Sequence, residues 1–190
     1  MITPVLTTRR LLLRPLRAAD ALRIQALFPH YEVLKYMFAG IPWPYPDDGA
    51  LQFVDSAIAG MTREERCVWA IVEEAAGDDL LIGCIDLFPN RPHDNRGFWL
   101  GLPYQGRGYM SEAVAAVNDF AFDVVRVPQL ILNNAEPNIA SHRLKEKAGA
   151  TVLQINEGVA YVGGVFREIR WTHTAEQWHA NRHRFLKSER

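Results

Sequence analysis

The stretch LPYQGRGYMSEAVAAV, from Leu102 to Val117, decides the fold because it joins a strand-like apolar run to an amphipathic helix through two glycines. Gly106 and Gly108 stand directly before the first apolar positions of that helix. Glycine lets the backbone approach a ligand closely, and the first amide groups of a helix have no acceptor within it. The stretch therefore predicts an anion-binding turn, with an ordinary tight turn as the alternative.

The bulk properties of the sequence predict a soluble globular protein. Of the 190 residues, 48% are hydrophobic and 23% are charged, and the formal net charge is −1. This length suits one hydrophobic core, so we expect residues 1–190 to form a single domain. A nearly neutral chain has no global field that attracts nucleic acid or an anionic membrane, so neither is expected as a partner.

Cysteine usage and the apolar runs predict a cytoplasmic location. Cys67 and Cys84 both lie in apolar runs, which indicates buried, reduced thiols rather than a disulfide. The N-terminal segment lacks the apolar core of a signal peptide, and no run reaches the ~18 apolar residues of a membrane span. We therefore expect a protein that is neither exported nor embedded in a membrane.

The order of the predicted elements indicates a mixed α/β fold. Short apolar runs predict strands, and apolar residues that recur every three or four positions predict helices. The expected strands are 10–16, 67–73, 80–88, 96–102, 129–137, 150–155 and 165–171, and the expected helices are 18–28, 31–37, 48–61, 109–124, 138–149 and 172–185. Asp20 is expected in a first helical turn, Asn138 and Gly149 at the two ends of one helix, and Thr174 with Gln177 in a capping box.

One helix and one loop carry further expectations. Met110, Val114, Val117, Ala121 and Val124 share helical spacing and predict an apolar stripe that packs on the sheet. The segment IPWPYPDD, residues 41–48, has three prolines that cannot donate backbone hydrogen bonds, so it is expected to be an ordered loop or lid.

Three phosphate-binding templates can be compared with the glycine turn. The nucleotide P-loop requires a GK[ST] ending that GRGYMSE lacks. A dinucleotide fingerprint requires a third Gly or an Ala where Ser111 stands and an acid where Asn133 and Asn134 stand. The third template, Q-x-x-G-x-G/A, matches Gln105, Gly106, Arg107, Gly108, Tyr109 and Met110, with Met110 in place of the small last residue.

That third template is the loop after strand four of the Gcn5-related N-acetyltransferases, and the chain resembles the RimJ/RimL branch of this family along nearly its whole length. The opening TTRRLLLRPLRAAD is similar to the first strand and helix of the branch. The segment NIASHRLKEKAGA, from Asn138 to Ala150, resembles the signature N-x-x-S-x-x-x-x-x-K-x-G. Two motifs in the correct order are more specific than either one alone.

The resemblance implies a GNAT fold, a single mixed and mostly antiparallel sheet of about seven strands, flanked by helices and splayed between strands four and five. It also implies acetyl-CoA as the cofactor, with the pyrophosphate on the amides of residues 106–110 and pantetheine between the splayed strands. Backbone groups near Leu100, Gly101 and Leu102 would hold pantetheine. Arg107, Arg143 and Lys147 are expected near the nucleotide phosphates, although a solvated charge is the default for each.

The resemblance further implies direct acetyl transfer to a primary amine, either a protein N-terminus or a small molecule, through a ternary complex. Ser141 is expected to donate to, or orient, the leaving thiolate, although a helix-terminal serine often bonds nearby backbone instead. Asn138 is expected to position the cofactor or a water as well as capping its helix. Asn95 stands where related chains often carry a catalytic Glu.

The missing acid leaves the base unassigned. Asp86 and Glu136 are the candidates, with a water chain or attack by an already neutral amine as further options. A non-catalytic acyl-CoA sensor is the alternative function, and a dinucleotide oxidoreductase is a weaker one. His179 and His183 lie four residues apart but lack a clear third ligand, so no metal is expected. A homodimer is left open.

Overall fold

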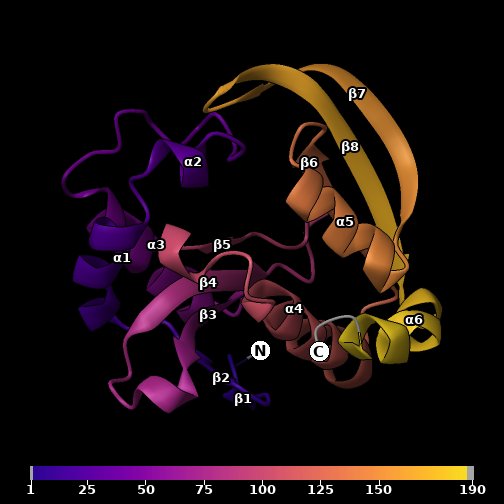
Figure 1. Ribbon diagram of the computed structural model, residues 1–190, viewed down its shortest axis with the longest axis horizontal. Helices are drawn as coiled ribbons and strands as arrows, with labels where there is room; N and C mark the ends of the chain where they lie inside the picture. Colours follow the sequence, from indigo (N-terminus) through magenta and orange to yellow (C-terminus); the bar gives the residue numbers. More distant parts are fainter. Residues whose placement is uncertain (1, 188–190) are drawn as a thin grey trace.

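The computed structural model describes residues 2–187, which form a mixed α/β fold of two hydrogen-bonded sheets (Figure 1). The strands are β1 (Leu6–Thr7), β2 (Leu11–Pro15), β3 (Cys67–Glu73), β4 (Leu81–Leu87), β5 (Phe98–Leu100), β6 (Gln129–Ala135), β7 (Thr151–Tyr161) and β8 (Gly164–Thr174). The helices are α1 (Ala21–Leu27), α2 (Tyr31–Leu34), α3 (Gly49–Thr62), α4 (Tyr109–Asp119), α5 (Ile139–Ala148) and α6 (Ala175–Lys187). None of the helices in this range is long and apolar enough to cross a bilayer.

The larger sheet has the order β1-β2-β3-β4-β5, and its central strand is buried on both faces. Side chains alternate along a strand, so Trp69 and Ile71 pack toward α4 while Val68 and Ala70 pack toward α1 and α3. Helices therefore cover both faces, and the core consists of two apolar clusters separated by the sheet.

Helix α1 is held against the sheet by a buried ion pair. The Arg14 guanidinium on β2 donates two hydrogen bonds of 2.9 and 2.8 Å to the Asp20 carboxylate. Asp20 is the last residue of a short 3-10 turn, Ala18–Asp20, which leads directly into α1. Asp20 thus lies in the first turn of the helical segment, where it also accepts the Arg17 amide at 2.8 Å, and it has the additional role of partner to the buried Arg14 guanidinium.

The segment after α4 departs from the expected apolar stripe. Val114, Val117 and Ala121 are fully buried, but Val124 is 67% exposed. Residues Phe120–Val125 form a π-helical segment, and its wider turns rotate the following side chains away from the α-helical stripe. The prediction for Val124 was therefore wrong.

The splay was predicted between the fourth and fifth expected strands, 96–102 and 129–137, which are β5 and β6 in the structure. It lies there, and it is the only break between the two sheets in residues 2–187. Asn95, just before β5, donates its backbone amide to the Ile131 carbonyl at 2.7 Å and accepts the Ile131 amide on Oδ1 at 2.5 Å. The Asn95 side chain also donates to the carbonyls of Phe88 and Arg91, both at 2.8 Å. No ladder follows along β5, so the strands are tied at Asn95 and separate beyond it.

A long hairpin connects the second sheet to the first half of the chain. Strands β7 and β8 have 11 residues each, and Figure 1 shows them arching over the molecule toward α2. At the tip, the amides of Val162 and Gly163 donate to the carbonyls of Met37 and Lys35 at 3.0 and 2.9 Å. The hairpin tip therefore fixes the loop that follows α2.

Most predicted elements are confirmed, and the differences lie at their ends. β7 and β8 are longer than expected, α2 is shorter, and β1 had not been predicted. The 41–48 segment contains neither helix nor strand. Asn138 caps α5 by accepting the Ser141 amide, Gly149 ends it with φ 89°, and Thr174 and Gln177 form the predicted capping box.

Replacing Asn95 by alanine is expected to lower the free energy of unfolding by about 2 to 4 kcal/mol, because backbone groups of Phe88, Arg91 and Ile131 lose their hydrogen bonds to this buried side chain. Urea denaturation of the purified protein would measure this change. Asn90→Ala, at an exposed position of the same connection, is the matched control. Equal stabilities of the two variants would contradict the assignment of Asn95 as the residue that ties the sheets.

Candidate active site

The two glycines of the turn before α4 have left-handed backbone conformations. Gly106 has φ 73° and Gly108 has φ 76°, which residues other than glycine rarely adopt. Gly108 is the N-cap of α4, no side chain caps this helix, and its first backbone bond runs from Glu112 N to Gly108 O. The amides of residues 109–111 therefore have no acceptor within the helix, as an anion-binding turn requires.

Side chains donate hydrogen bonds to two backbone carbonyl groups around this turn. Gln105 Nε2 donates to the Leu100 carbonyl at 2.9 Å, and Arg10 Nη1 donates to the Arg107 carbonyl at 2.9 Å. Gln105, the first residue of the predicted cofactor-binding motif, braces the turn against the end of β5 through this bond. Because the carbonyls are engaged, the turn presents mainly N–H groups.

A negative residue in the first turn of α4 is neutralised by its neighbours. Glu112 is almost fully buried, and its carboxylate accepts hydrogen bonds from Thr8 Oγ1, from the Arg10 amide and from Arg10 Nε. Burial alone would raise the pKa of Glu112, but the bonds from Thr8 and Arg10 outweigh it and lower the pKa. The ion pair with Arg10 removes the repulsion that this carboxylate would exert on an anion at the turn.

The splay exposes one edge of β5. Asp86 N and Gly97 O form a bond at 2.9 Å, and Gly101 N donates to Ile82 O at 2.9 Å, so these positions of β5 face β4. Backbone groups alternate along an antiparallel strand, which directs those of Phe98 and Leu100 toward the gap. Leu100 thus lies at the edge expected for pantetheine, whereas Leu102 begins a short 3-10 turn after the strand.

Ser141 and Asn138 lie together at the start of α5. The Asn138 side chain accepts the Ser141 amide at 3.2 Å, and the Ser141 hydroxyl accepts a hydrogen bond of 2.6 Å from Lys145 Nζ. Within residues 2–187, no group accepts the Ser141 hydroxyl proton. Ser141 is therefore arranged as a donor whose oxygen is already hydrogen-bonded to an amine.

Lys145 was not predicted to be part of the site. It is 3% exposed, and burial, followed by repulsion from Arg96, lowers its pKa to about 7. A lysine in a polar helix is usually a solvated charge. The available signal was its spacing, because position 145 lies one turn after Ser141 and shares its helix face.

The other residues expected near the cofactor lie in the turn before α4 and on α5. Arg107 follows Gly106 in the turn and is exposed, and Arg143 and Lys147 are exposed on α5. Tyr109 is buried, with its hydroxyl bonded to the Glu73 carboxylate, and Met110 packs on the core, so only their backbone groups face the turn.

Asp86 is the candidate base with an unusual environment. Its Oδ1 accepts the Gly97 amide at 2.5 Å, and a Cβ at Gly97 would lie 2.9 Å from that oxygen, so only glycine leaves room for the carboxylate. Burial raises the pKa of Asp86 to about 7, although the Gly97 amide and Arg66 act in the opposite direction. A carboxyl group with this pKa can exchange protons near neutral pH.

The other candidate base is engaged in an ion-pair network. Glu136 Oε1 lies 2.9 Å from Arg167 Nη1, and Arg167 Nε lies 3.2 Å from Glu157. The side chains of Glu136 and Arg167 are both 44% exposed. Asn95 stands where related chains often carry a catalytic Glu, and its side chain here bonds backbone groups and links the two sheets. The structure therefore favours Asp86 over Glu136.

Asp86 lines a cavity of 370 Å³ between the larger sheet, α1, α3 and the 37–46 loop. Tyr45 from the predicted lid also lines it, and its ring packs edge-on against Phe28 at 5.2 Å. Trp43 does not line the cavity and packs instead on Tyr31 at 5.6 Å. Of the two lid aromatics, only Tyr45 is placed to contact an acceptor.

Phe98 joins this cavity to the gap that holds Ser141. Phe98 lines the cavity beside Asp86 and Gly97, its side chain packs against the core cluster on the α4 face of the sheet, and Lys145 Nζ lies 5.9 Å from the centre of its ring. Lys145 in turn bonds Ser141. The cavity and the gap thus meet on the two sides of β5.

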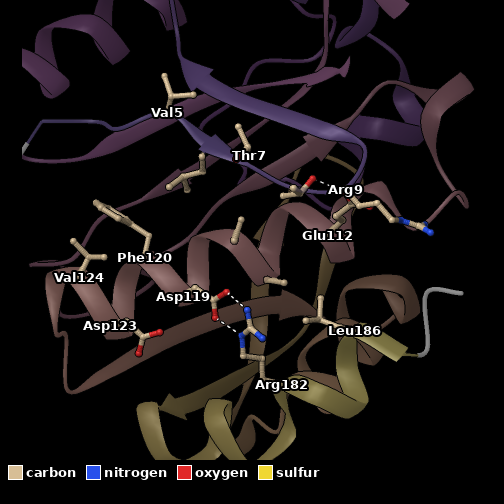
Figure 2. A pocket seen from close by; sticks show the side chains of 14 residues that line it. Val5, Thr7, Arg9, Glu112, Asp119, Phe120, Asp123, Val124, Arg182 and Leu186 are labelled. Carbon is tan, nitrogen blue, oxygen red and sulfur yellow. Dashed lines mark hydrogen bonds and ion pairs between the residues drawn. The ribbon is translucent and has the colours of Figure 1, made fainter. Parts of the chain in front are cut away.

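A larger hollow of 750 Å³ lies between β1, α4 and α6, on the other face of the sheet. Figure 2 shows Asp119 and Arg182 facing each other across it, and both pairs of atoms are 2.7 Å apart. Trp178 Nε1 also donates to Asp119 at 2.9 Å. Among the described residues, the three carboxylates that line this hollow, those of Glu112, Asp119 and Asp123, are all paired with basic side chains, in contrast to Asp86.

Comparisons with known proteins identify relatives along most of the chain. The sequence model of the family described as "Acetyltransferase (GNAT) domain" matches residues 10–151. YnaD of Bacillus subtilis (strain 168), described as an uncharacterized N-acetyltransferase, is 29% identical over 146 residues, which are 76% of this chain and 81% of YnaD.

Solved structures share this fold at low sequence identity. Mycobacterium smegmatis RimJ in complex with CoA-disulfide is 16% identical, with a TM-score of 0.81 over 97% of this chain and 94% of RimJ. The ribosomal-protein-S5-alanine acetyltransferase from Vibrio fischeri is also 16% identical, with a TM-score of 0.75 over 92% of this chain and 98% of that one. The predicted fold class is confirmed.

The raised pKa of Asp86 predicts a pH-dependent cost in stability. Its folded pKa of about 7 exceeds the unfolded value of about 4, so Asp86 destabilises the folded state increasingly as pH rises through this window. Asp86→Asn is therefore expected to gain about 2 kcal/mol more relative to wild type at pH 8 than at pH 5.

Urea denaturation at the two pH values measures this difference. Asp55→Asn, on the exposed side of α3, removes the same charge far from the cavity and is the control. A gain for Asp86→Asn that is equal at both pH values would show that the carboxyl group is not held in the environment described.

Proposed function

The chain belongs to the GNAT acetyltransferase family, and we propose that it transfers the acetyl group of acetyl-CoA directly to a primary amine in a ternary complex. The observation that carries the proposal is the meeting of two half-sites at β5. The turn before α4 leaves helix amides uncapped, and Ser141 is linked through Lys145 to Phe98 of β5. Asp86 lines a cavity on the α1 and α3 face of the sheet beside Phe98 and Trp99.

The residues present fit acetyl-CoA. The uncapped amides at the start of α4 suit a pyrophosphate, and the open edge of β5 offers pantetheine the backbone groups of Phe98 and the amide of Leu100, whose carbonyl already accepts a hydrogen bond from Gln105. Arg107, Arg143 and Lys147 would add positive charge near the phosphates. When bound, the cofactor supplies an acetyl group activated as a thioester.

Asp86 is proposed to accept the proton that the amine loses. Amines are mostly protonated at neutral pH, whereas only the neutral amine is nucleophilic. Asp86 has a pKa of about 7, close to the operating pH, where a general base combines basicity with a sufficient ionised fraction. Gly97 keeps this carboxylate oriented through its amide.

Ser141 is proposed to donate its hydroxyl hydrogen to the leaving thiolate. Lys145 Nζ already donates to the Ser141 oxygen at 2.6 Å, which increases the acidity of the hydroxyl and fixes its orientation. Lys145 acts through Ser141 and is a positioning residue. Asn138 is proposed to cap α5 and to hold the first turn that carries Ser141.

The acceptor class in this proposal is a primary amine, on a small molecule or a protein N-terminus. An acyl-CoA sensor without turnover is the contrasting function. It would require the turn but would have no use for a carboxylate of raised pKa in an adjoining cavity. Thioester cleavage in the presence of an amine panel separates the two functions.

Blocking the turn is expected to abolish cofactor binding. Gly106→Leu places a side chain among the outward amides and should weaken acetyl-CoA binding by about a hundredfold or more, as loss of several charge-assisted bonds implies. Isothermal titration calorimetry measures the dissociation constant for acetyl-CoA, and NADH serves as the negative control.

Gly77→Leu is the matched control for this experiment. Gly77 has φ 68°, close to that of Gly106. A Cβ added at either glycine would have no other atom within 4 Å apart from those of its own and the adjacent residues. Both variants therefore carry the same backbone strain of about 1 to 2 kcal/mol. Unchanged binding by Gly106→Leu, or equal weakening in both variants, would refute the assignment of the turn.

Removing the Ser141 hydroxyl is expected to lower kcat by about 10- to 100-fold, because the leaving thiolate loses its donor. The affinity for acetyl-CoA should stay within about twofold, since the phosphate contacts are untouched. Thiol release and titration calorimetry give the two quantities. Ser56→Ala, on the exposed side of α3, is the control, and an unchanged kcat for Ser141→Ala would remove Ser141 from the mechanism.

A further inference from the structure

We propose that the acceptor is a small primary amine with a single positive charge on an aryl or branched aliphatic body, bound in the 370 Å³ cavity with its nitrogen at Asp86. This inference rests on the proposed function and narrows its acceptor. Four features of the cavity support it.

The first feature is the charge of the lining. Of the 18 residues that line the cavity within the described chain, Asp86 is the only one with a charged side chain. One carboxylate matches one ammonium group. A second ammonium group of a polyamine would be buried without a counter-ion, which is strongly unfavourable.

The second feature is the apolar wall opposite this charge. Large apolar side chains come from the helices, from the loop and from β5, and they are those of Ile24, Phe28, Phe53, Met37, Ile41 and Trp99. Such a wall gains free energy from the apolar body of an amine, at roughly 25 cal/mol for each Å² removed from water.

The third feature is that the aromatic wall is fixed before any acceptor arrives. Phe28 packs against Tyr45 at 5.2 Å and against Trp99 at 4.9 Å between ring centres. A Cβ at Gly49 would lie 2.7 Å from the Tyr45 ring, so Gly49 leaves the space that this ring occupies. Burial raises the pKa of Tyr45 to about 12, so its phenol stays neutral and adds no second charge.

The fourth feature distinguishes a small amine from a peptide. A bound peptide must hydrogen-bond its backbone amides, or it loses their hydration without compensation. Apart from Asp86, the side chains of the lining that form strong hydrogen bonds are those of Tyr45, Gln52 and Trp99. Gln52 is exposed, and its Nε2 already bonds Asp48 at 2.8 Å. The lining therefore suits a compact apolar group better than a chain of amides.

The charged groups that act on Asp86 from beyond the lining do not alter this balance. Within the described chain, the one carboxylate hydrogen-bonded to a lining side chain is that of Asp48, which is engaged with Gln52. Arg66 and Arg91 both act on Asp86 and favour its ionised form, while Asp94 opposes it. The Arg91 guanidinium lies 3.6 Å from the centre of the Phe88 ring. None of these three charged residues lines the cavity, so none offers a direct partner to a second ammonium group.

The test compares kcat/KM for phenethylamine, isoamylamine, spermidine and a short peptide with N-terminal alanine, at saturating acetyl-CoA. Phenethylamine and isoamylamine are expected to exceed spermidine and the peptide by about a hundredfold, since burying an unpaired charge or amide is costly. A preference for spermidine or the peptide would overturn the inference and leave the proposed transferase function standing.

A pair of variants tests the charge argument itself. Ile41→Asp adds a second carboxylate at a partly exposed position of the cavity wall, and should reduce the preference for phenethylamine over spermidine by about tenfold or more. Leu51→Asp adds the same charge at a 52% exposed position of α3 outside the cavity and should leave the preference unchanged.

An unchanged preference in Ile41→Asp would show that the acceptor binds elsewhere and would overturn the inference. Acetyl-CoA binding without turnover of any amine would instead refute the proposed function, and the inference would fall with it. The two failures are therefore distinguishable.

Discussion

The arrangement of the site depends on one interruption of backbone pairing, the loss of the ladder between β5 and β6 beyond Asn95. Backbone groups buried without partners are costly, so an open strand edge persists only where water or a ligand can reach it. Here the opposite edge of β5 is paired with β4 at Gly83, Cys84 and Ile85. A Cβ at Gly83 would lie 2.2 Å from the Trp99 carbonyl, so glycine permits this close pairing. The unpaired groups are thereby confined to a single edge.

Strand β5 also separates two buried ionisable groups whose pKa values converge from opposite directions. Burial disfavours the charged form of each group, so it raises the pKa of Asp86 and lowers that of Lys145, both to about 7. In the proposed reaction an amine loses a proton on one side of β5 and a thiolate is released on the other. Groups with a pKa near neutral pH can take part in such steps with little free energy spent on changing their protonation.

Features that depend on local sequence could be predicted, and features that depend on distant neighbours could not. The caps at Asn138 and Gly149 follow from short-range hydrogen bonding and were predicted. The environment of Lys145 includes Arg96, which lowers its pKa, and the Phe98 ring, both almost 50 residues earlier in the chain, so no local sequence pattern could predict it. Asp86 and Glu136 were both recognised as carboxylates near the expected reaction centre, but the sequence could not distinguish them. Their environments differ only after folding, because a glycine leaves space beside the first while an arginine pairs with the second.

The β7–β8 hairpin compensates for the missing ladder by linking the same two halves at a distance. At one end, β8 pairs with β6 from Gln129 to Ala135, beside the gap. At the other end, the hairpin tip bonds the backbone of Lys35 and Met37, and Met37 belongs to the acceptor cavity. An 11-residue strand extends over about 36 Å. The hairpin therefore connects the sheet that carries β6 to a wall of the Asp86 cavity through backbone hydrogen bonds at both ends, while the edge of β5 facing β6 stays open.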